Sequence, residues 1–386
     1  MAAITLSQML QHPYVLGVFS RLLPAGLQFQ NVYGATATST ATEPLNLNRH
    51  CVYDIFDNTR TNAVVRPPMV GPHKRGPKPV GQSSATALRL YESMPFPYEK
   101  VYGMRALGGQ FGALDSTGQN WVARQMSYAA ARFANAIEFM QSRVFRGGFS
   151  VTVNGDEWVL GELSASGYTF NVDYQIPSGN KTTVGGIIDA EWDLAATKIV
   201  NHMLELNKYS QLLTGYEIRH CWINSSTFKH MLANTQLSSV RGTAMRMFED
   251  YQRTLVQTNG AARNIGFTVT FPSMPQFLWH IYDATSVVAS QTDPAMGANT
   301  TSTDALYVPD GKMICTPEPE PGGWHGMYHA AEVIRETDES APTIKAGLSS
   351  WSTPTNHPPG EELVMLHNLV PLLYNPWSVF YVDVWS

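Results

Sequence analysis

The stretch from Gly118 to Gly148 reads GQNWVARQMSYAAARFANAIEFMQSRVFRGG. Its apolar side chains recur at spacings of three and four, which is the pattern of one side of an α-helix. Side chains from Asp115 to Thr117 can cap the start of this helix, and Gly147-Gly148 can end it. The sequence therefore predicts a helix of about 28 residues and roughly 40 Å, the longest in the chain, with these apolar residues on one face: Val122, Met126, Ala129, Phe133, Ile137, Met140 and Val144.

A β-hairpin is predicted directly after this helix. Phe149–Val153 and Trp158–Leu160 have the composition of two strands, and Asn154-Gly155 between them is a turn signal. We expect Phe133 and Ile137 of the helix to be buried against the sheet that begins at Phe149.

Further elements follow in mixed order. A second helical block is expected from Asp189, which would cap it, and a shorter helix after Asn224. Strands are expected at Tyr216–Ile223, Gly266–Phe271, Phe277–Ile281, Ala305–Val308 and Met313–Cys315, with a turn at Pro309-Asp310-Gly311. Helices mixed with antiparallel hairpins indicate an α+β fold class.

Composition restricts the class of protein. The chain has 386 residues, of which 44% are hydrophobic and 15% charged, so it can bury a core and is not disordered. A net charge of −5 gives no overall basic field, which disfavours direct nucleic-acid binding. Cys51, Cys221 and Cys315 are far apart and odd in number, which argues against a zinc site or a disulfide framework. No secretion signal or membrane span is evident, so we expect synthesis in the cytoplasm.

Two segments have too little apolar surface to form domains. The first fifty residues indicate an arm with one short amphipathic stretch, and Val65–Pro97 is dense in Pro and Gly. We expect Val65–Pro97 to protrude as a loop without structure of its own, and to become ordered by touching something else. It carries a basic cluster that we expect to pair with acidic residues of a neighbouring subunit, a solvated loop being the alternative: His73, Lys74, Arg75 and Lys78.

The strongest enzymatic candidate is the set His325, His329 and Glu332. On a helix the two imidazoles would share a face and could bind a metal ion. The flanking residues are more typical of a strand or loop, where positions 325 and 329 stand about 13 Å apart, too far for one ion. We therefore expect no metal site, no cofactor and no catalytic residues.

The order of these elements resembles the major capsid protein E family of tailed bacteriophages, the lambda-type head proteins. Tyr53-Asp54-Ile55 resembles the start of the family's extended loop, and Gly118–Gly148 its spine helix, which leads into a short hairpin. DALYVPDGKMICTP, from Asp304 to Pro317, resembles its strand, turn and strand. NLVPLLYNPWSVFYVDV, from Asn368 to Val384, resembles its C-terminal strand pair.

The resemblance implies a Hong Kong 97-type fold. Its parts would be an N-terminal arm (1–50), an extended loop with flanking strands (51–115), a peripheral domain with the spine helix (116–185 and 356–386) and an axial domain (186–355). The implied function is a major capsid protein that self-assembles, as hexamers and pentamers, into the icosahedral shell around a double-stranded DNA genome. Scaffold, portal and decoration proteins would be further partners, and the shell would assemble in the host cytoplasm.

Other functions remain open at this point. An encapsulin-like compartment would share the fold. A metal-dependent enzyme built on His325 and His329, or a monomeric module that binds a carbohydrate or a host, would not.

Overall fold

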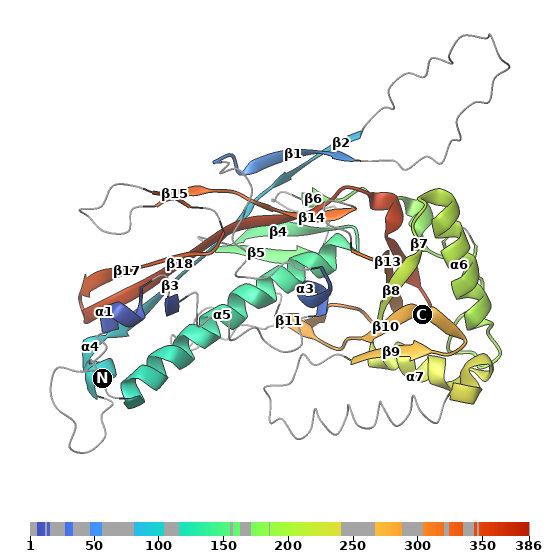
Figure 1. The fold of residues 1–386 in the computed structure, drawn as a ribbon, viewed down its shortest axis with the longest axis horizontal. Coiled ribbons are helices and arrows are strands. Elements are labelled where there is room, and N and C mark those ends of the chain that lie inside the picture. Colours follow the sequence, from blue (N-terminus) through green and yellow to red (C-terminus); the bar gives the residue numbers. More distant parts are fainter. Residues whose placement is uncertain are drawn as a thin grey trace, which may run out of the picture. The chain divides into compact units, whose positions relative to one another are not determined.

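The computed structural model describes fourteen stretches of the chain: 6–11, 14–15, 28–33, 47–55, 81–103, 116–154, 157–162, 171–184, 186–240, 267–287, 304–319, 324–334, 343–345 and 347–385. The chain divides into two compact units. Unit 1 comprises residues 1–51, 85–141 and 327–371, and unit 2 comprises 52–84, 142–326 and 372–386. Both units contain helices and strands, which are labelled in Figure 1.

A sheet around one long strand organises unit 1. Strand β18 (Pro359–Leu373) pairs antiparallel with β17 (Ser349–Asn356) and with β3 (Leu88–Pro97), and β14 (His325–His329) is its other neighbour. Helix α5 (Ser116–Val144) packs against this sheet (Figure 1). Smaller elements are α1 (Leu6–Met9), α3 (Gln28–Tyr33), α4 (Tyr98–Gly103), β15 (Glu332–Ile334) and β16 (Thr343–Lys345).

The predicted long helix is confirmed as α5, and all seven of its predicted apolar residues are buried. Phe133 and Ile137 retain only 2% and 1% exposure, as expected. Phe133 was expected to pack against the sheet that begins at Phe149, and this prediction is wrong. Phe133 belongs instead to a cluster with Phe96 of β3 and Leu363 of β18. The helix therefore covers the sheet of β18 there, and not the hairpin that follows it in sequence.

A six-stranded sheet forms the centre of unit 2, in the order β7-β19-β13-β8-β10-β9. Its middle strands β13 (Lys312–Pro317) and β8 (Ile218–Ile223) are antiparallel. The outer strands are β7 (Lys181–Thr182), β19 (Phe380–Asp383), β10 (Met274–Ile281) and β9 (Phe267–Phe271). Helices α6 (Ile199–Leu213) and α7 (Ser225–Ala233) pack against this sheet (Figure 1).

The predicted hairpin is confirmed in unit 2. Strands β4 (Gly148–Asn154) and β5 (Glu157–Glu162) pair antiparallel, and β6 (Asn171–Asp173) adds a third strand on the other side of β4. The predicted turn before β13 is also present, and Gly311 there adopts a φ of +70°, which favours glycine. A short pair, β11 (Thr285–Val287) and β12 (Asp304–Leu306), precedes that turn.

The expected cap at Asn224 is confirmed, because its side chain accepts a hydrogen bond from the backbone N–H of Thr227 (2.8 Å) at the start of α7. The prediction that a helix begins at Asp189 is wrong, because α6 begins at Ile199. Residues before Ile199 are non-helical, and Lys198 precedes the first turn of α6. The side chain of Asp189 instead contacts His202.

Two other expectations need correction. The second half of Val65–Pro97 is not a loop, because β2 (Gly81–Thr86) pairs with β1 (His50–Ile55) and β3 pairs with β18 along ten residues. The Pro and Gly of this segment obscured an alternation of covered and exposed residues along β3. The C-terminal strands β18 and β19 are both present, but they belong to different sheets and do not pair with each other.

Candidate functional site

The basic cluster His73, Lys74, Arg75 and Lys78 lies outside the described residues. The strands on either side of it, β1 and β2, are described, as are the residues that hold their ends. The candidate site is therefore the root of this segment, which we define as residues 48–51, 85–92, 328–332 and 367–368, all in unit 1.

Glu332 is the centre of the root. One carboxylate oxygen, Oε2, lies 3.2 Å from Nη2 of Arg49 and accepts a hydrogen bond from Nδ2 of Asn368 (2.7 Å). The other oxygen, Oε1, lies 3.0 Å from Nη2 of Arg89. One partly buried carboxylate thus joins the residue before β1, the second residue of β3 and strand β18.

Further hydrogen bonds hold the root. The N–H of Ala87, between β2 and β3, donates to the carbonyl of Arg49 (2.7 Å). His50 and Thr86 contact each other through their side chains (3.3 Å), and the hydroxyl of Tyr328 donates to the carbonyl of Asn48. The start of β1 and the end of β2 are therefore held at one place.

Strand β3 is also tied to helix α5. Nε of Arg132 lies 2.9 Å from a carboxylate oxygen of Glu92. Burial raises the pKa of Glu92, and the adjacent Arg132 charge opposes this rise. Further along, the rings of Phe96 and Trp121 meet edge to face at 5.8 Å. The strand that follows the basic segment is thus held on both its sheet and its helix side.

Part of the expected N-terminal arm is anchored in unit 1. Glu138 of α5 is fully buried, and its two oxygens accept hydrogen bonds from the backbone N–H groups of Phe29 (2.8 Å) and Gln30 (3.0 Å). The Gln30 side chain donates to the carbonyl of Ala134 (2.6 Å). A carboxylate that accepts from the first N–H groups of α3, which have no acceptor within the helix, is a stabilising arrangement. Glu138 is the single acid of α5, but nothing in the local sequence identifies the backbone groups that it binds.

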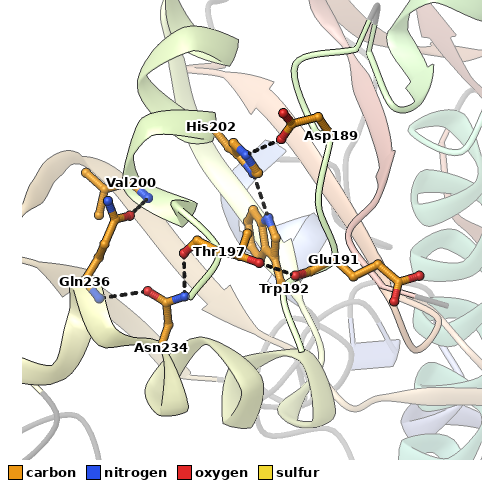
Figure 2. Close-up of polar contacts among 8 residues, drawn as sticks. All are labelled: Asp189, Glu191, Trp192, Thr197, Val200, His202, Asn234 and Gln236. Atoms are coloured by element: carbon orange, nitrogen blue, oxygen red, sulfur yellow. Dashed lines mark hydrogen bonds and ion pairs between the residues drawn. The ribbon is translucent and has the colours of Figure 1, made fainter. Parts of the chain in front are cut away.

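A loop in unit 2 is held against α6 by buried polar contacts (Figure 2). Trp192 is fully buried, and its indole N–H lies 3.4 Å from Nδ1 of His202. The other ring nitrogen, Nε2, lies 2.9 Å from Oδ1 of Asp189. Because Nδ1 accepts from the indole, Nε2 carries the proton and donates to the carboxylate.

Three further hydrogen bonds hold the end of this loop, next to the start of α6 (Figure 2). The Thr197 hydroxyl donates to the carbonyl of Glu191 (2.6 Å), and the Asn234 side chain donates to the carbonyl of Thr197 (2.6 Å). The backbone N–H of Val200 donates to the Gln236 side chain (3.0 Å), which satisfies one N–H of the first turn of α6. These contacts explain why the residues after Asp189 are ordered without being helical.

Three large apolar side chains are exposed on this part of unit 2: Leu194 (56%), Leu204 (45%) and Leu212 (70%). Leu204 and Leu212 lie about two turns apart on α6, hence on similar sides of it. Exposed apolar side chains of this size can take part in contacts with another chain.

The three residues of the rejected metal site have other roles. The segment His325–His329 is strand β14, as the flanking residues indicated. His329 lies with Nδ1 3.1 Å from Nε2 of the fully buried His367, and the two rings stack at 5.3 Å. Glu332 binds the two arginines of the root. Within the described stretches, no group of three His, Cys, Asp or Glu side chains is placed to hold a metal ion.

The sequence matches no protein-family profile and no curated protein. Its fold matches solved structures over nearly their full length, two of which follow. A phage-related protein from Bordetella bronchiseptica RB50 is 9% identical, with a TM-score of 0.50 and coverage of 100% of this chain and 98% of that one. A putative capsid protein of a prophage of E. coli CFT073 is 10% identical, with a TM-score of 0.52 and complete coverage of both chains.

These likenesses agree with the expected fold. The chain has an α+β fold of the Hong Kong 97 type, as the order of its elements implied. Among the helices that the structure describes, none has the length and hydropathy needed to cross a membrane.

Proposed function

We propose that this chain is a major capsid protein, which self-assembles into the icosahedral shell that encloses the genome of a tailed bacteriophage. The observation that carries the proposal is the match of the whole chain to the whole of a putative prophage capsid protein. Its role is structural and not catalytic.

The segment that carries His73, Lys74, Arg75 and Lys78 contacts a neighbouring subunit in this proposal. Two observations support it. Glu332 and the backbone contacts around it hold the start of β1 and the end of β2, the two strands that flank the cluster in the sequence. The chain also has more acidic than basic residues, 31 against 26, so a neighbouring copy offers carboxylates as partners.

The remaining parts take the roles that the resemblance implies. Residues 1–50 act as the arm, 51–115 as the extended loop, 116–185 with 356–386 as the peripheral domain, and 186–355 as the axial domain. The exposed leucines 194, 204 and 212 lie in the axial part and serve contacts between subunits of one hexamer or pentamer. Many weak contacts suffice, because closed symmetry makes them cooperative.

Partners and location follow from the same proposal. The shell assembles in the host cytoplasm with scaffold, portal or decoration proteins, and in the virion it encloses double-stranded DNA without sequence-specific contacts. A net charge of −5 accords with a shell that does not bind DNA tightly.

Sedimentation of the full-length recombinant protein tests the proposal. A capsid protein moves through a density gradient as large particles at neutral pH and moderate salt. Protein that sediments only as a monomer or small oligomer, over a range of salt and protein concentrations, contradicts it.

A further inference from the structure

The six-stranded sheet of unit 2 brings two cysteines together that lie far apart in the sequence. Cys221 of β8 and Cys315 of β13 are directly opposite each other in the antiparallel register, and their Sγ atoms are 3.6 Å apart. Both are free thiols with no exposed surface. Cys51, on β1, is only half-buried.

The surroundings of this pair are apolar. On the outer side of β13, Cys315 lies opposite Phe380 of β19, and on the outer side of β8, Cys221 lies beside Trp279 of β10. All four side chains belong to one buried cluster. Burial raises the pKa of the Cys221 thiol well above its usual range, and the contact with Cys315 raises it further. At neutral pH the Cys221 thiol is therefore almost entirely protonated, which slows its reaction with any oxidant, while burial excludes large reagents.

We propose that Cys221 and Cys315 are a modification site, at which a small neutral oxidant such as hydrogen peroxide forms a disulfide between β8 and β13. Opposite residues of an antiparallel pair have Cα atoms about 4.5–5.5 Å apart, which falls within the range that a disulfide spans. The two sulfur atoms need to approach by about 1.5 Å to reach bonding distance. A peroxide molecule is little larger than water, whereas a peptide disulfide such as oxidised glutathione would have to open the sheet.

The chemistry balances with peroxide as the only co-reactant. One sulfur attacks a peroxide oxygen, the O–O bond breaks, and a sulfenic acid and one water form. The second sulfur then attacks the sulfenic sulfur and displaces its oxygen, which leaves as a second water with the second thiol proton. Two thiols and one peroxide thus give one disulfide and two waters, and the two electrons pass from sulfur to oxygen.

The disulfide would close a long loop of chain. The linked residues are 94 positions apart, and the loop includes α7, β9 and β10. Long loops closed by a cross-link lose much of their freedom in the unfolded state, so oxidation stabilises unit 2. The inference concerns the folded chain itself, and it stands or falls independently of whether subunits assemble into a shell.

The test uses full-length protein with Cys51→Ser, which leaves the core unchanged and removes the half-buried thiol. The folded protein is treated with hydrogen peroxide, then denatured with an alkylating reagent and digested for mass spectrometry. We expect a peptide pair linked through Cys221 and Cys315 that lacks two hydrogens, and a thermal midpoint several degrees higher that a reductant lowers again. The matched variant Cys51→Ser/Cys315→Ala should show no linked peptide and no reductant-sensitive shift.

Two results would overturn the inference. One is recovery of both cysteines as alkylated thiols after the folded protein has been oxidised, while Cys51 of the unmutated chain is oxidised under the same conditions. The other is a linked peptide that forms only when peroxide is added to denatured protein. Both results are measured on proteins that keep Cys221 and Cys315, so they hold even where the Cys315→Ala variant folds poorly.

Discussion

Glu332 shows at the scale of single residues how one carboxylate can organise the root of the basic segment. Replacing Glu332 by Gln keeps the size of the side chain and removes the charge that attracts Arg49 and Arg89. Because both arginine side chains are more than 40% exposed, the expected loss in the free energy of unfolding is small, about 1 kcal/mol. We expect a larger effect on the yield of assembled particles, since the contacts that hold β1 and β3 at the root become weaker.

Chemical denaturation and gradient sedimentation check this prediction. Glu99→Gln is the matched control, because Glu99 is exposed on α4 and lies outside the root. Equal particle yields for the two variants would show that the root has no part in assembly.

The stacked pair His329 and His367 predicts an acid-sensitive stability. Burial, and secondly the neighbouring His329, lower the pKa of His367 to about 3, and burial also lowers the pKa of His329. Both imidazoles are therefore neutral in the folded state, while in the unfolded chain they bind protons below a pH of about 6.5. At His367 the unfolded state binds more protons between about pH 6.5 and 3, so stability falls as the pH falls through this window, by up to about 1.4 kcal/mol per pH unit. The lowered pKa of His329 adds a loss in the same direction.

Urea unfolding at several pH values between about 7 and 4.5 measures this slope. His367→Asn removes one of the two groups and should give a shallower loss of stability toward acid than the unmutated chain. An unchanged slope in His367→Asn would contradict the assigned protonation.

Some of these residues could be predicted from the sequence and others could not. Asn224 was identifiable because a cap depends on local sequence alone. Glu138, the cysteine pair and the partners of Glu332 depend on contacts across 94 or more residues, or across several strands, and no local pattern encodes these. Asp189 had the composition of a cap, yet His202 and Trp192 hold its loop in a non-helical form.

At the scale of elements, the packing of α5 gives a direct test. Phe133 is buried in the cluster that joins α5 to β3 and β18, so Phe133→Ala should lower the free energy of unfolding by about 3–5 kcal/mol. Tyr128 on the same helix is 54% exposed, and Tyr128→Ala should cost less than about 0.5 kcal/mol. Thermal or urea unfolding of the two variants checks the difference, and similar losses in both would show that the helix faces another way.

The anchoring of α3 is a second test at this scale. Glu138→Ala removes the acceptor of two backbone N–H groups and leaves them without that partner, which typically costs about 1–3 kcal/mol for each buried group. We expect faster hydrogen exchange at Phe29 and Gln30 and earlier proteolytic cleavage near α3, with α5 itself unaffected. Exchange rates at Phe29 and Gln30 equal to those of the unmutated chain would refute the anchor.

Periodicity decided which elements were predictable. Helix α5 has an apolar residue every three or four positions from Val122 to Val144, and the β4–β5 hairpin has a strong turn signal, so both were predicted closely. Strand β3 was missed because Pro95 and Pro97 suggested a loop, although it pairs with β18 along its whole length. That pairing comes from a strand far later in the chain, which local sequence does not reveal.

For the whole molecule, the fold class and the order of elements could be predicted, because each long element carried its own signal and their order resembled a known family. The two compact units could not be predicted, since each is assembled from three separate stretches of chain. The contacts of the basic cluster stay a prediction, and they can be tested by removing it.

Deletion of Gly71–Val80 removes His73, Lys74, Arg75 and Lys78 and leaves β1 and β2 in place. We expect a subunit with an unchanged unfolding midpoint that no longer forms closed shells, because the contact with the neighbouring subunit is lost. A control deletes an equal length outside the described helices and strands, such as 290–299. Normal shells from the Gly71–Val80 deletion would show that the basic cluster is merely solvated.

The central claim, that this chain builds a shell, is tested most directly by electron microscopy of the purified full-length protein. The account predicts closed, hollow, icosahedral particles, with maps in which the Hong Kong 97-type subunit repeats and residues 56–80 lie against an adjacent copy. Images of dispersed monomers, or of particles whose repeating unit has another fold, would contradict it.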